Sequence, residues 1–124
     1  MIAAAANAAQ LELQDDQLVL SMIEMGRRAV AHLGGRSFDD FAGDPALVDA
    51  VSGCLLGVAL AAGEVSEHLS NWLTDVPWGD LTSLASWRVH HIRTEENLRA
   101  LFQTIERLPG VLASLECFED PPTR

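Results

Sequence analysis

The stretch that decides the fold is TEENLRALFQTIERLPGVLASLE, residues 94–116. Its apolar residues recur three and four positions apart, which places them on one face of an α-helix. They are Leu98, Leu101, Ile105, Leu108, Leu112 and Leu115. Thr94 can cap the start of this helix, and Glu95 and Arg99 can form an i,i+4 ion pair on its outer face. Pro109 predicts a kink or a restart within the helix.

A second amphipathic helix is predicted over residues 15–33. Its inner face would carry Leu18, Met22, Met25, Ala29 and Leu33. Gly34 and Gly35 follow directly, and glycine adopts the left-handed conformation that ends many helices. We therefore expect this helix to stop at Leu33.

A longer helix is predicted from Asp44-Pro45 to about Leu73. Asp44 suits the N-cap and Pro45 suits the first helical position. Its inner face would carry Leu47, Val51, Cys54, Val58, Ala61, Val65, Leu69 and Trp72. Gly53, Gly57 and Ala61 recur at four-residue spacing and would let another helix approach closely. That helix could belong to the same chain or to a second copy, and the sequence leaves both alternatives open.

A short helix over residues 78–91 completes the set, because Pro77 suits a helix start. The connection over residues 37–41 carries two phenylalanines that we expect to plug the core. No segment alternates with the period of a β-strand. The prediction is an all-α, up-and-down four-helix bundle over residues 15–117, with a flexible segment at 1–14 and a disordered tail at 118–124.

Composition excludes several classes of protein. The chain has 124 residues and a formal net charge of −10, and all eight basic residues are arginine. Such a charge repels a phosphate backbone, so tight non-specific binding of nucleic acid is not expected. The longest uncharged run, residues 50–63, is shorter than the roughly 20 residues of a membrane span. We expect a soluble cytoplasmic protein without a signal peptide or a membrane partner.

The titratable side chains do not form a recognisable metal or cofactor motif. Cys54 and Cys117 lack metal-ligand spacing and are expected to be free thiols. Glu64 and His68 would share one helix face, but a di-iron bundle requires Glu-x-x-His pairs that the chain lacks. No cofactor and no metal site is therefore predicted.

The segment LASWRVHHI, residues 84–92, is the main candidate for a functional site, because it combines basic and aromatic side chains in an acidic chain. Three other landmarks precede it in a fixed order. They are SFDDFAGD at 37–44, GEVSEHLS at 63–70 and VPW at 76–78. Together they resemble the S-F-x-x-F-x-x-D, G-E-A-x-x-L-S and I-P-W elements of the HepT-like branch of the HEPN superfamily, and the resemblance covers roughly residues 16–116.

The resemblance implies a homodimeric four-helix bundle that acts as a metal-independent endoribonuclease toxin. It also implies a minimal nucleotidyltransferase as antitoxin partner. The family's motif is arginine, four residues, histidine, one residue, tyrosine. In this motif the histidine acts as general acid or base at the 2′-hydroxyl or the leaving oxygen, and the arginine stabilises charge on the phosphate.

Laid on this chain, the motif histidine falls on His90, the arginine position on Ala85 and the tyrosine position on Ile92. The chain contains no tyrosine, so the residue that the antitoxin modifies is also missing. Loss of a charge-stabilising group typically lowers a rate by about 100- to 1000-fold. We therefore expect RNA cleavage to be weak or absent, and the sequence leaves open whether this copy is a working enzyme.

Three neighbours of His90 could compensate. Arg88, His91 and Arg93 are candidates for contact with a phosphate or with RNA, because two copies of this strip would meet across a dimer. The alternative is a non-catalytic helical interaction module that binds a nucleotidyltransferase or another protein. A plain four-helix bundle unrelated to HEPN proteins is the third alternative.

Overall fold

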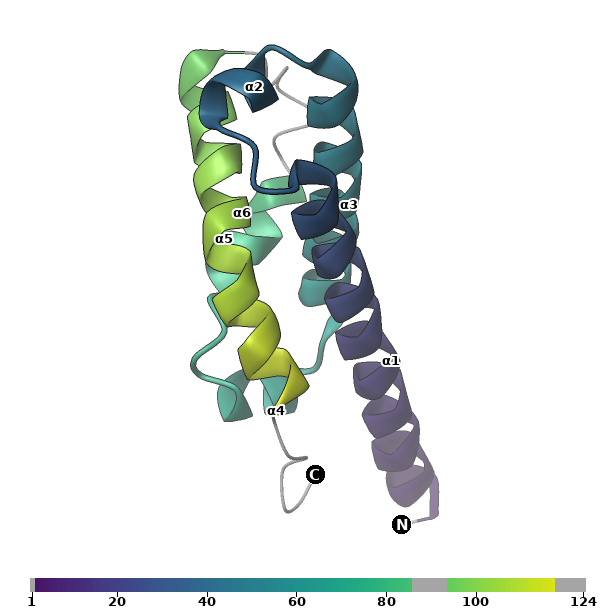
Figure 1. The fold of residues 1–124 in the computed structure, drawn as a ribbon. Coiled ribbons are helices and arrows are strands. Elements are labelled where there is room, and N and C mark those ends of the chain that lie inside the picture. The colour runs from purple at the N-terminus through teal and green to yellow at the C-terminus, as the bar shows by residue number, and fades with distance from the viewer. Residues whose placement is uncertain (1, 86–93, 118–124) are drawn as a thin grey trace.

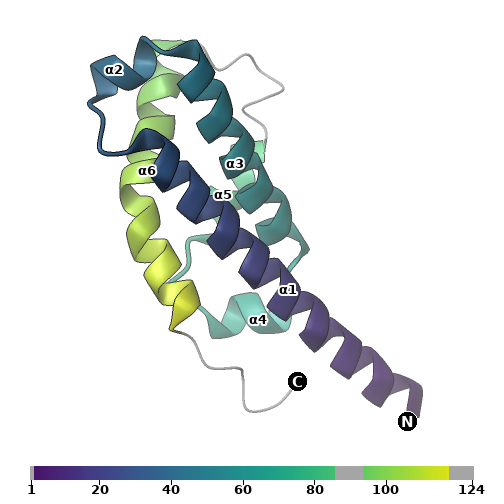
Figure 2. The same cartoon turned by 45° about the vertical axis from the view of Figure 1, so that its right-hand side comes forward.

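The structure is a computed structural model that describes residues 2–85 and 94–117, with side chains from Gln10 onward. The described residues form six helices and no strand, so the expected all-α class is confirmed. The helices are α1 (Ile2–Leu33), α2 (Phe38–Ala42), α3 (Pro45–Glu64), α4 (Glu67–Trp72), α5 (Trp78–Ser83) and α6 (Glu95–Glu116). The three long helices α1, α3 and α6 form a bundle, with α2 at one end and α4 at the other (Figures 1 and 2).

Helix α6 confirms the periodicity that predicted it. All six apolar residues of its inner face are buried. The Thr94 hydroxyl accepts a hydrogen bond from the Asn97 N–H at 3.2 Å, and Arg99 pairs with Glu95 at 3.0 Å. The helix continues through Pro109 without a restart, and its axis curves toward the C-terminal end (Figures 1 and 2).

Two other predicted helix ends are also confirmed. Gly34 and Gly35 adopt φ values of 58° and 75° after Leu33, so the left-handed conformation ends α1. The Asp44 carboxylate accepts a hydrogen bond from the Leu47 N–H at 3.2 Å and caps α3. Local chemistry within a few residues was sufficient to predict both.

The connection between α1 and α3 closes one end of the core. It contains the short helix α2, whose Phe41 is fully buried. Phe38 is half-buried and packs edge-to-face on Phe102 of α6, with ring centroids 5.7 Å apart. The prediction that these two phenylalanines plug the core is confirmed.

The predicted start of helix α1 is wrong. It begins at Ile2 and not near Asp15, and its N-terminal part extends beyond the rest of the bundle (Figures 1 and 2). Alanines fill most of residues 3–9, and alanine has the highest helix propensity. Leu13 and Leu20 stay exposed on this helix, at 64% each.

The predicted continuous helix from Asp44 to Leu73 is wrong. The chain instead ends α3 at Glu64, extends at Val65 and Ser66, and begins α4 at Glu67. The Ser66 hydroxyl caps α4 by accepting a hydrogen bond from the Leu69 N–H at 3.2 Å. Trp72, expected on the inner face, is 48% exposed on α4.

Helix α5 begins at Trp78, as predicted, and ends at Ser83. The remainder of the helix expected over residues 78–91 extends into residues 86–93, which lie outside the described residues. Trp78 is half-buried, and its indole N–H donates to the Leu73 carbonyl at 3.0 Å. This bond ties the start of α5 to the end of α4.

Candidate functional site

The four side chains predicted to act on RNA are Arg88, His90, His91 and Arg93, and all four lie outside the described residues. The structure describes both ends of the segment that carries them. On one side, Leu84 is buried and Ala85 packs against the core. On the other side, Thr94 caps α6 and Leu98 is buried one turn later.

The position at which the resemblance would place the motif arginine is therefore described. It is Ala85, a partly buried residue two positions after the end of α5 that packs against the hydrophobic core. No charged side chain of the described residues occupies this position. The Cβ of an arginine at this position would lie at the surface of the bundle, and its long side chain could extend the guanidinium into solvent.

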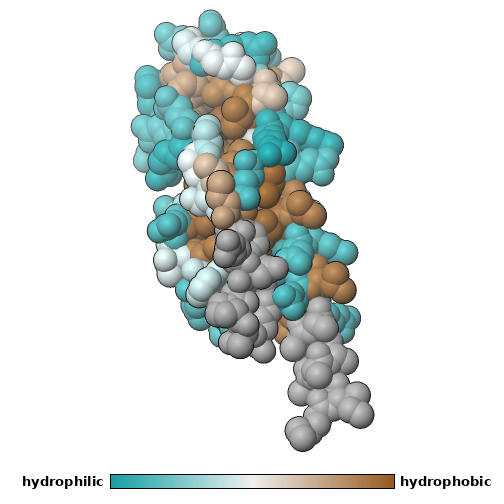
Figure 3. Space-filling model, turned by 60° about the horizontal axis from the view of Figure 1, so that its bottom comes forward, coloured by the Kyte–Doolittle hydropathy of each residue, from teal (hydrophilic) through white to brown (hydrophobic). Residues whose placement is uncertain are grey.

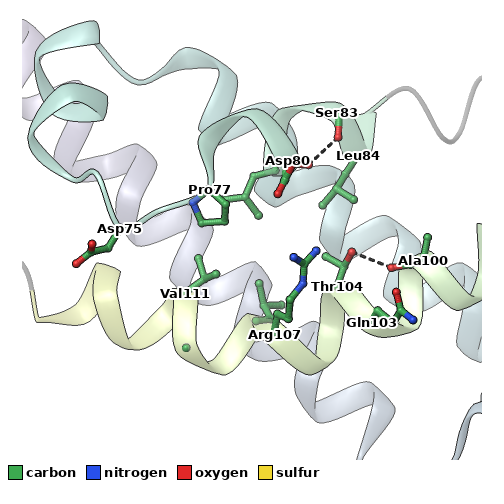
Figure 4. A pocket seen from close by; sticks show the side chains of 13 residues that line it. Asp75, Pro77, Asp80, Ser83, Leu84, Ala100, Gln103, Thr104, Arg107 and Val111 are labelled. Carbon is green, nitrogen blue, oxygen red and sulfur yellow. Dashed lines mark hydrogen bonds between the residues drawn. The ribbon is translucent and has the colours of Figure 1, made fainter.

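A cavity of about 480 Å³ lies beside this position, between the α4–α5 connection, α5 and α6 (Figure 4). Leu81, Leu84, Leu108 and Val111 give it apolar walls. Its polar lining comes from Asp75, Asp80, Gln103, Thr104 and Arg107. The Thr104 hydroxyl donates to the Ala100 carbonyl at 2.9 Å, which leaves its oxygen able to accept a hydrogen bond.

Arg107 differs from the other arginines of the described residues, because its side chain forms neither a hydrogen bond nor an ion pair with any described residue. The other four described arginines all have partners. Arg27 pairs with Glu116 at 2.6 Å, Arg28 with Glu24 at 2.8 Å, Arg36 with the His32 carbonyl at 2.8 Å, and Arg99 with Glu95. Arg99 also lies over the Phe38 ring, 4.2 Å from its centroid.

Sequence reasoning did not single out Arg107. The helical periodicity shows only that this residue lies outside the apolar face of α6. Its lack of a partner and its place on a cavity wall depend on where α5 and the α4–α5 connection lie. No local sequence signal marks either property.

Asp15 is a buried polar residue that sequence reasoning also missed. Its carboxylate accepts hydrogen bonds from the Ser66 N–H at 2.9 Å and the Ser66 hydroxyl at 2.6 Å, and the residue is 2% exposed. These bonds hold the break between α3 and α4 against α1. A serine three residues after Gly63, followed by Glu67, was the available signal of a new helix start.

The metal alternative loses its geometric basis in the described residues. Glu64 ends α3 and His68 lies in α4, so the two do not share one helix face as expected. Within residues 2–85 and 94–117, no group of three His, Cys, Asp or Glu side chains is arranged to hold a metal ion.

Both cysteines are free thiols, as predicted, and their surroundings differ. Cys117 is exposed at the end of α6. Burial raises the pKa of the Cys54 thiol above its ordinary value of 9.0, and the positive charge of Arg28 partly offsets this effect. Cys54 therefore has the character of a packing residue and not of a nucleophile.

One side of the molecule carries an apolar groove between α1 and α6. Val19, Leu20, Ile23 and Leu115 line an opening of about 570 Å³ there, which Arg27 and Glu116 border. Figure 3 looks onto this side, where apolar side chains gather along the middle and hydrophilic ones along the edges. This surface could pack against a partner protein.

Helix α3 is long and apolar enough to cross a membrane by length and composition alone. Within its most apolar stretch, 56% of the residues are buried inside the bundle, as in the central helix of many folded domains. The other described helices do not meet this criterion.

Comparisons with known proteins return no match to a family model, to a curated protein or to a solved structure. The functional assignment consequently depends on the residues of this chain.

Proposed function

We propose that this chain is a HepT-like HEPN protein, an up-and-down four-helix bundle that forms a cytoplasmic homodimer in a toxin–antitoxin type of module. Its inherited activity is metal-independent cleavage of single-stranded RNA at the groove between two copies. His90 is the general acid or base, and a minimal nucleotidyltransferase is the partner.

One observation carries this proposal, namely the order and spacing of four sequence landmarks along an all-helical chain. The landmarks at 37–44, 63–70 and 76–78 precede His90 in the order and with the spacing that resemble the family. The fold is compatible with them, because Asp44 caps α3, Ser66 caps α4 and Trp78 begins α5. The family landmarks thus coincide with helix starts.

The same alignment predicts impaired catalysis. Ala85 replaces the residue that would neutralise charge on the scissile phosphate, and Ile92 replaces the residue that the antitoxin modifies. Histidine alone can transfer a proton but cannot stabilise a phosphorane-like charge as a guanidinium does. Arg88, His91 and Arg93, supplied by both copies, are the candidates for phosphate contact.

The direct test is incubation of the purified protein with single-stranded RNA in the presence of EDTA. We expect weak or absent cleavage, and any cleavage that occurs should be removed by His90→Ala. His68→Ala, at an exposed position of α4, is the matched control. Robust cleavage that depends on His90 would contradict the predicted impairment. Cleavage that is equal in the wild type and in His90→Ala would contradict the assignment of His90.

A second function is a non-catalytic interaction module, and the exposed leucines of α1 favour it. Leu13 and Leu20 are seven residues apart, so they lie on one face of α1, and Leu20 lines the α1–α6 groove. The groove could seat a helix of a nucleotidyltransferase by its apolar face. The test is co-elution with a minimal nucleotidyltransferase, which Leu20→Glu should abolish while His90→Ala should not.

A further inference from the structure

The cavity between α5 and α6 holds two opposite charges that do not pair with each other. The Asp80 carboxylate, from α5, and the Arg107 guanidinium, from α6, point into the same space (Figure 4). They form neither a hydrogen bond nor an ion pair, and no other described residue gives either side chain one. Both residues are exposed to solvent, so an acceptor and a donor that no described residue occupies face a common volume and can bond to a ligand that displaces water.

The volume and walls of the cavity fit a flat organic ring. At about 480 Å³, the cavity lies within the roughly 300–1,000 Å³ of typical small-molecule sites. Leu81, Leu84, Leu108 and Val111 offer apolar surface for the faces of the ring. Apolar walls with a few convergent polar groups are the usual composition of such sites.

The charges restrict the kind of ligand. A simple anion would meet the carboxylates of Asp75 and Asp80, and a simple cation would meet Arg107. A wholly apolar ligand would leave both charges without partners. The ligand must therefore present hydrogen-bond donors on one edge and acceptors on another.

We propose that this cavity binds a guanine base. The N1–H and the exocyclic amino group of guanine are adjacent donors that match the two oxygens of Asp80. Guanine O6 and N7 are adjacent acceptors that match the bidentate guanidinium of Arg107. Uracil offers one N–H donor, and adenine lacks the second acceptor at this edge, so neither base satisfies both side chains.

The location connects this site to the proposed RNA cleavage. Leu84 on the cavity wall directly precedes Ala85, the position of the missing motif arginine. A guanine held here would place the adjoining nucleotide near Ala85, so under the proposed function the cavity would select a base close to the scissile bond. That the guanine belongs to an RNA rests on the proposed function. The contacts of the base with Asp80 and Arg107 do not depend on that function.

The test is NMR titration of the full chain with guanosine 5′-monophosphate, uridine 5′-monophosphate and inorganic phosphate. We expect guanosine monophosphate to shift the amide signals of Leu84, Thr104 and Val111, and to bind at least about tenfold more tightly than uridine monophosphate. Equal shifts with both nucleotides, or with phosphate alone, would overturn the proposal. This comparison uses the wild-type protein and needs no variant.

Variants then assign the two contacts. Asp80→Asn and Arg107→Ala should each weaken binding of guanosine monophosphate by about tenfold or more. Asp39→Asn on α2 and Arg28→Ala on α1 remove the same charges away from the cavity and should leave binding unchanged. Unchanged binding in Asp80→Asn would overturn the assignment.

The inference and the proposed function can fail separately. His90-dependent cleavage of RNA without any guanosine monophosphate binding would contradict the guanine site and leave the ribonuclease assignment intact. Guanosine monophosphate binding by a protein that does not cleave RNA even as a folded Ala85→Arg variant would support the guanine site and contradict the ribonuclease assignment.

Discussion

The Asp15 carboxylate is buried inside the bundle, where it accepts hydrogen bonds from the N–H and the hydroxyl of Ser66. Hydrogen bonds to a charged group contribute about 1.5–3 kcal/mol, and a buried donor that loses its acceptor is destabilising. This single side chain fixes where α3 ends and α4 begins. Its contribution is a matter of stability and not of catalysis.

Asp15→Asn should lower the free energy of unfolding by about 1–3 kcal/mol, because the amide cannot accept both bonds with a full charge. Urea denaturation followed by circular dichroism measures the change. Gln14→Ala, at the exposed neighbouring position, should change stability by less than about 0.5 kcal/mol. Equal effects of the two substitutions would show that the Asp15–Ser66 bonds do not stabilise the break.

The two cysteines should react at different rates. The thiolate is the reactive form, and the raised pKa of Cys54 keeps less of it as thiolate at any pH below that value. A disulfide reagent at pH 8 should therefore modify Cys117 first. In Cys117→Ser, modification of Cys54 should accelerate steadily as the pH rises, because the thiolate fraction grows until the pH passes the raised pKa of this thiol.

Arg28→Ala should slow Cys54 further at a given pH, since the nearby positive charge partly lowers the thiol pKa. The exposed Arg36→Ala serves as the control, because Arg36 bonds to the His32 carbonyl. Equal reaction rates of Cys54 and Cys117 in the wild type would contradict the claim that burial raises the pKa of Cys54.

At the scale of helices, the structure assigns one of the small residues of α3 to packing within the chain and leaves Gly53 open. A Cβ atom on Gly57 would lie 3.1 Å from Met25 Cγ, so Gly57 makes room for α1 of the same chain. A Cβ on Gly53 would meet no atom of the described residues within 4 Å. Gly26 of α1 is tighter still, because its Cβ would lie 2.6 Å from Leu112 Cδ2 of α6.

Gly53→Ala should raise the free energy of unfolding by about 0.5–1 kcal/mol, because alanine has the higher helix propensity and space is available. Gly26→Ala should lower it, since Leu112 is buried and must move. Thermal or urea unfolding of each variant gives the comparison. Were Gly53 part of a dimer seam, Gly53→Ala would also weaken dimerisation, which sedimentation at several concentrations would detect.

The predicted elements divide according to the range of the interactions that define them. The buried face of α6 and the caps at Thr94 and Asp44 depend on residues within a turn, and all were predicted correctly. The break between α3 and α4 depends on Asp15 and Ser66, which are 51 residues apart. Periodicity alone continued across that break, so the sequence predicted one helix where there are two.

The same division applies to the candidate site. His90 was predicted from a local motif, and its placement lies outside the described residues. Asp80 and Arg107 could not be predicted together, because they reach the same cavity only once the fold places α5 and α6 on its two sides. The sequence thus predicts the site's chemistry by resemblance, while the adjoining cavity requires the structure.

At the scale of the whole molecule, the proposal requires two copies, because the family's motif acts across a two-fold axis. Light scattering after size-exclusion chromatography should give twice the chain mass of 13.4 kDa. Because the net charge is −10, the molecule as a whole repels RNA. If a local basic strip binds RNA, that binding should weaken as the salt concentration increases. A monomer at all concentrations would remove the groove that the proposed chemistry needs.

The central claim is that His90 is in register for RNA cleavage and lacks its arginine at position 85. Restoring it by Ala85→Arg, and measuring cleavage of single-stranded RNA in EDTA, tests this most directly. The account predicts a rate increase of about 100- to 1000-fold over the wild type, abolished in the Ala85→Arg, His90→Ala double variant. No increase in a folded, dimeric Ala85→Arg protein, or an increase that persists without His90, would contradict it.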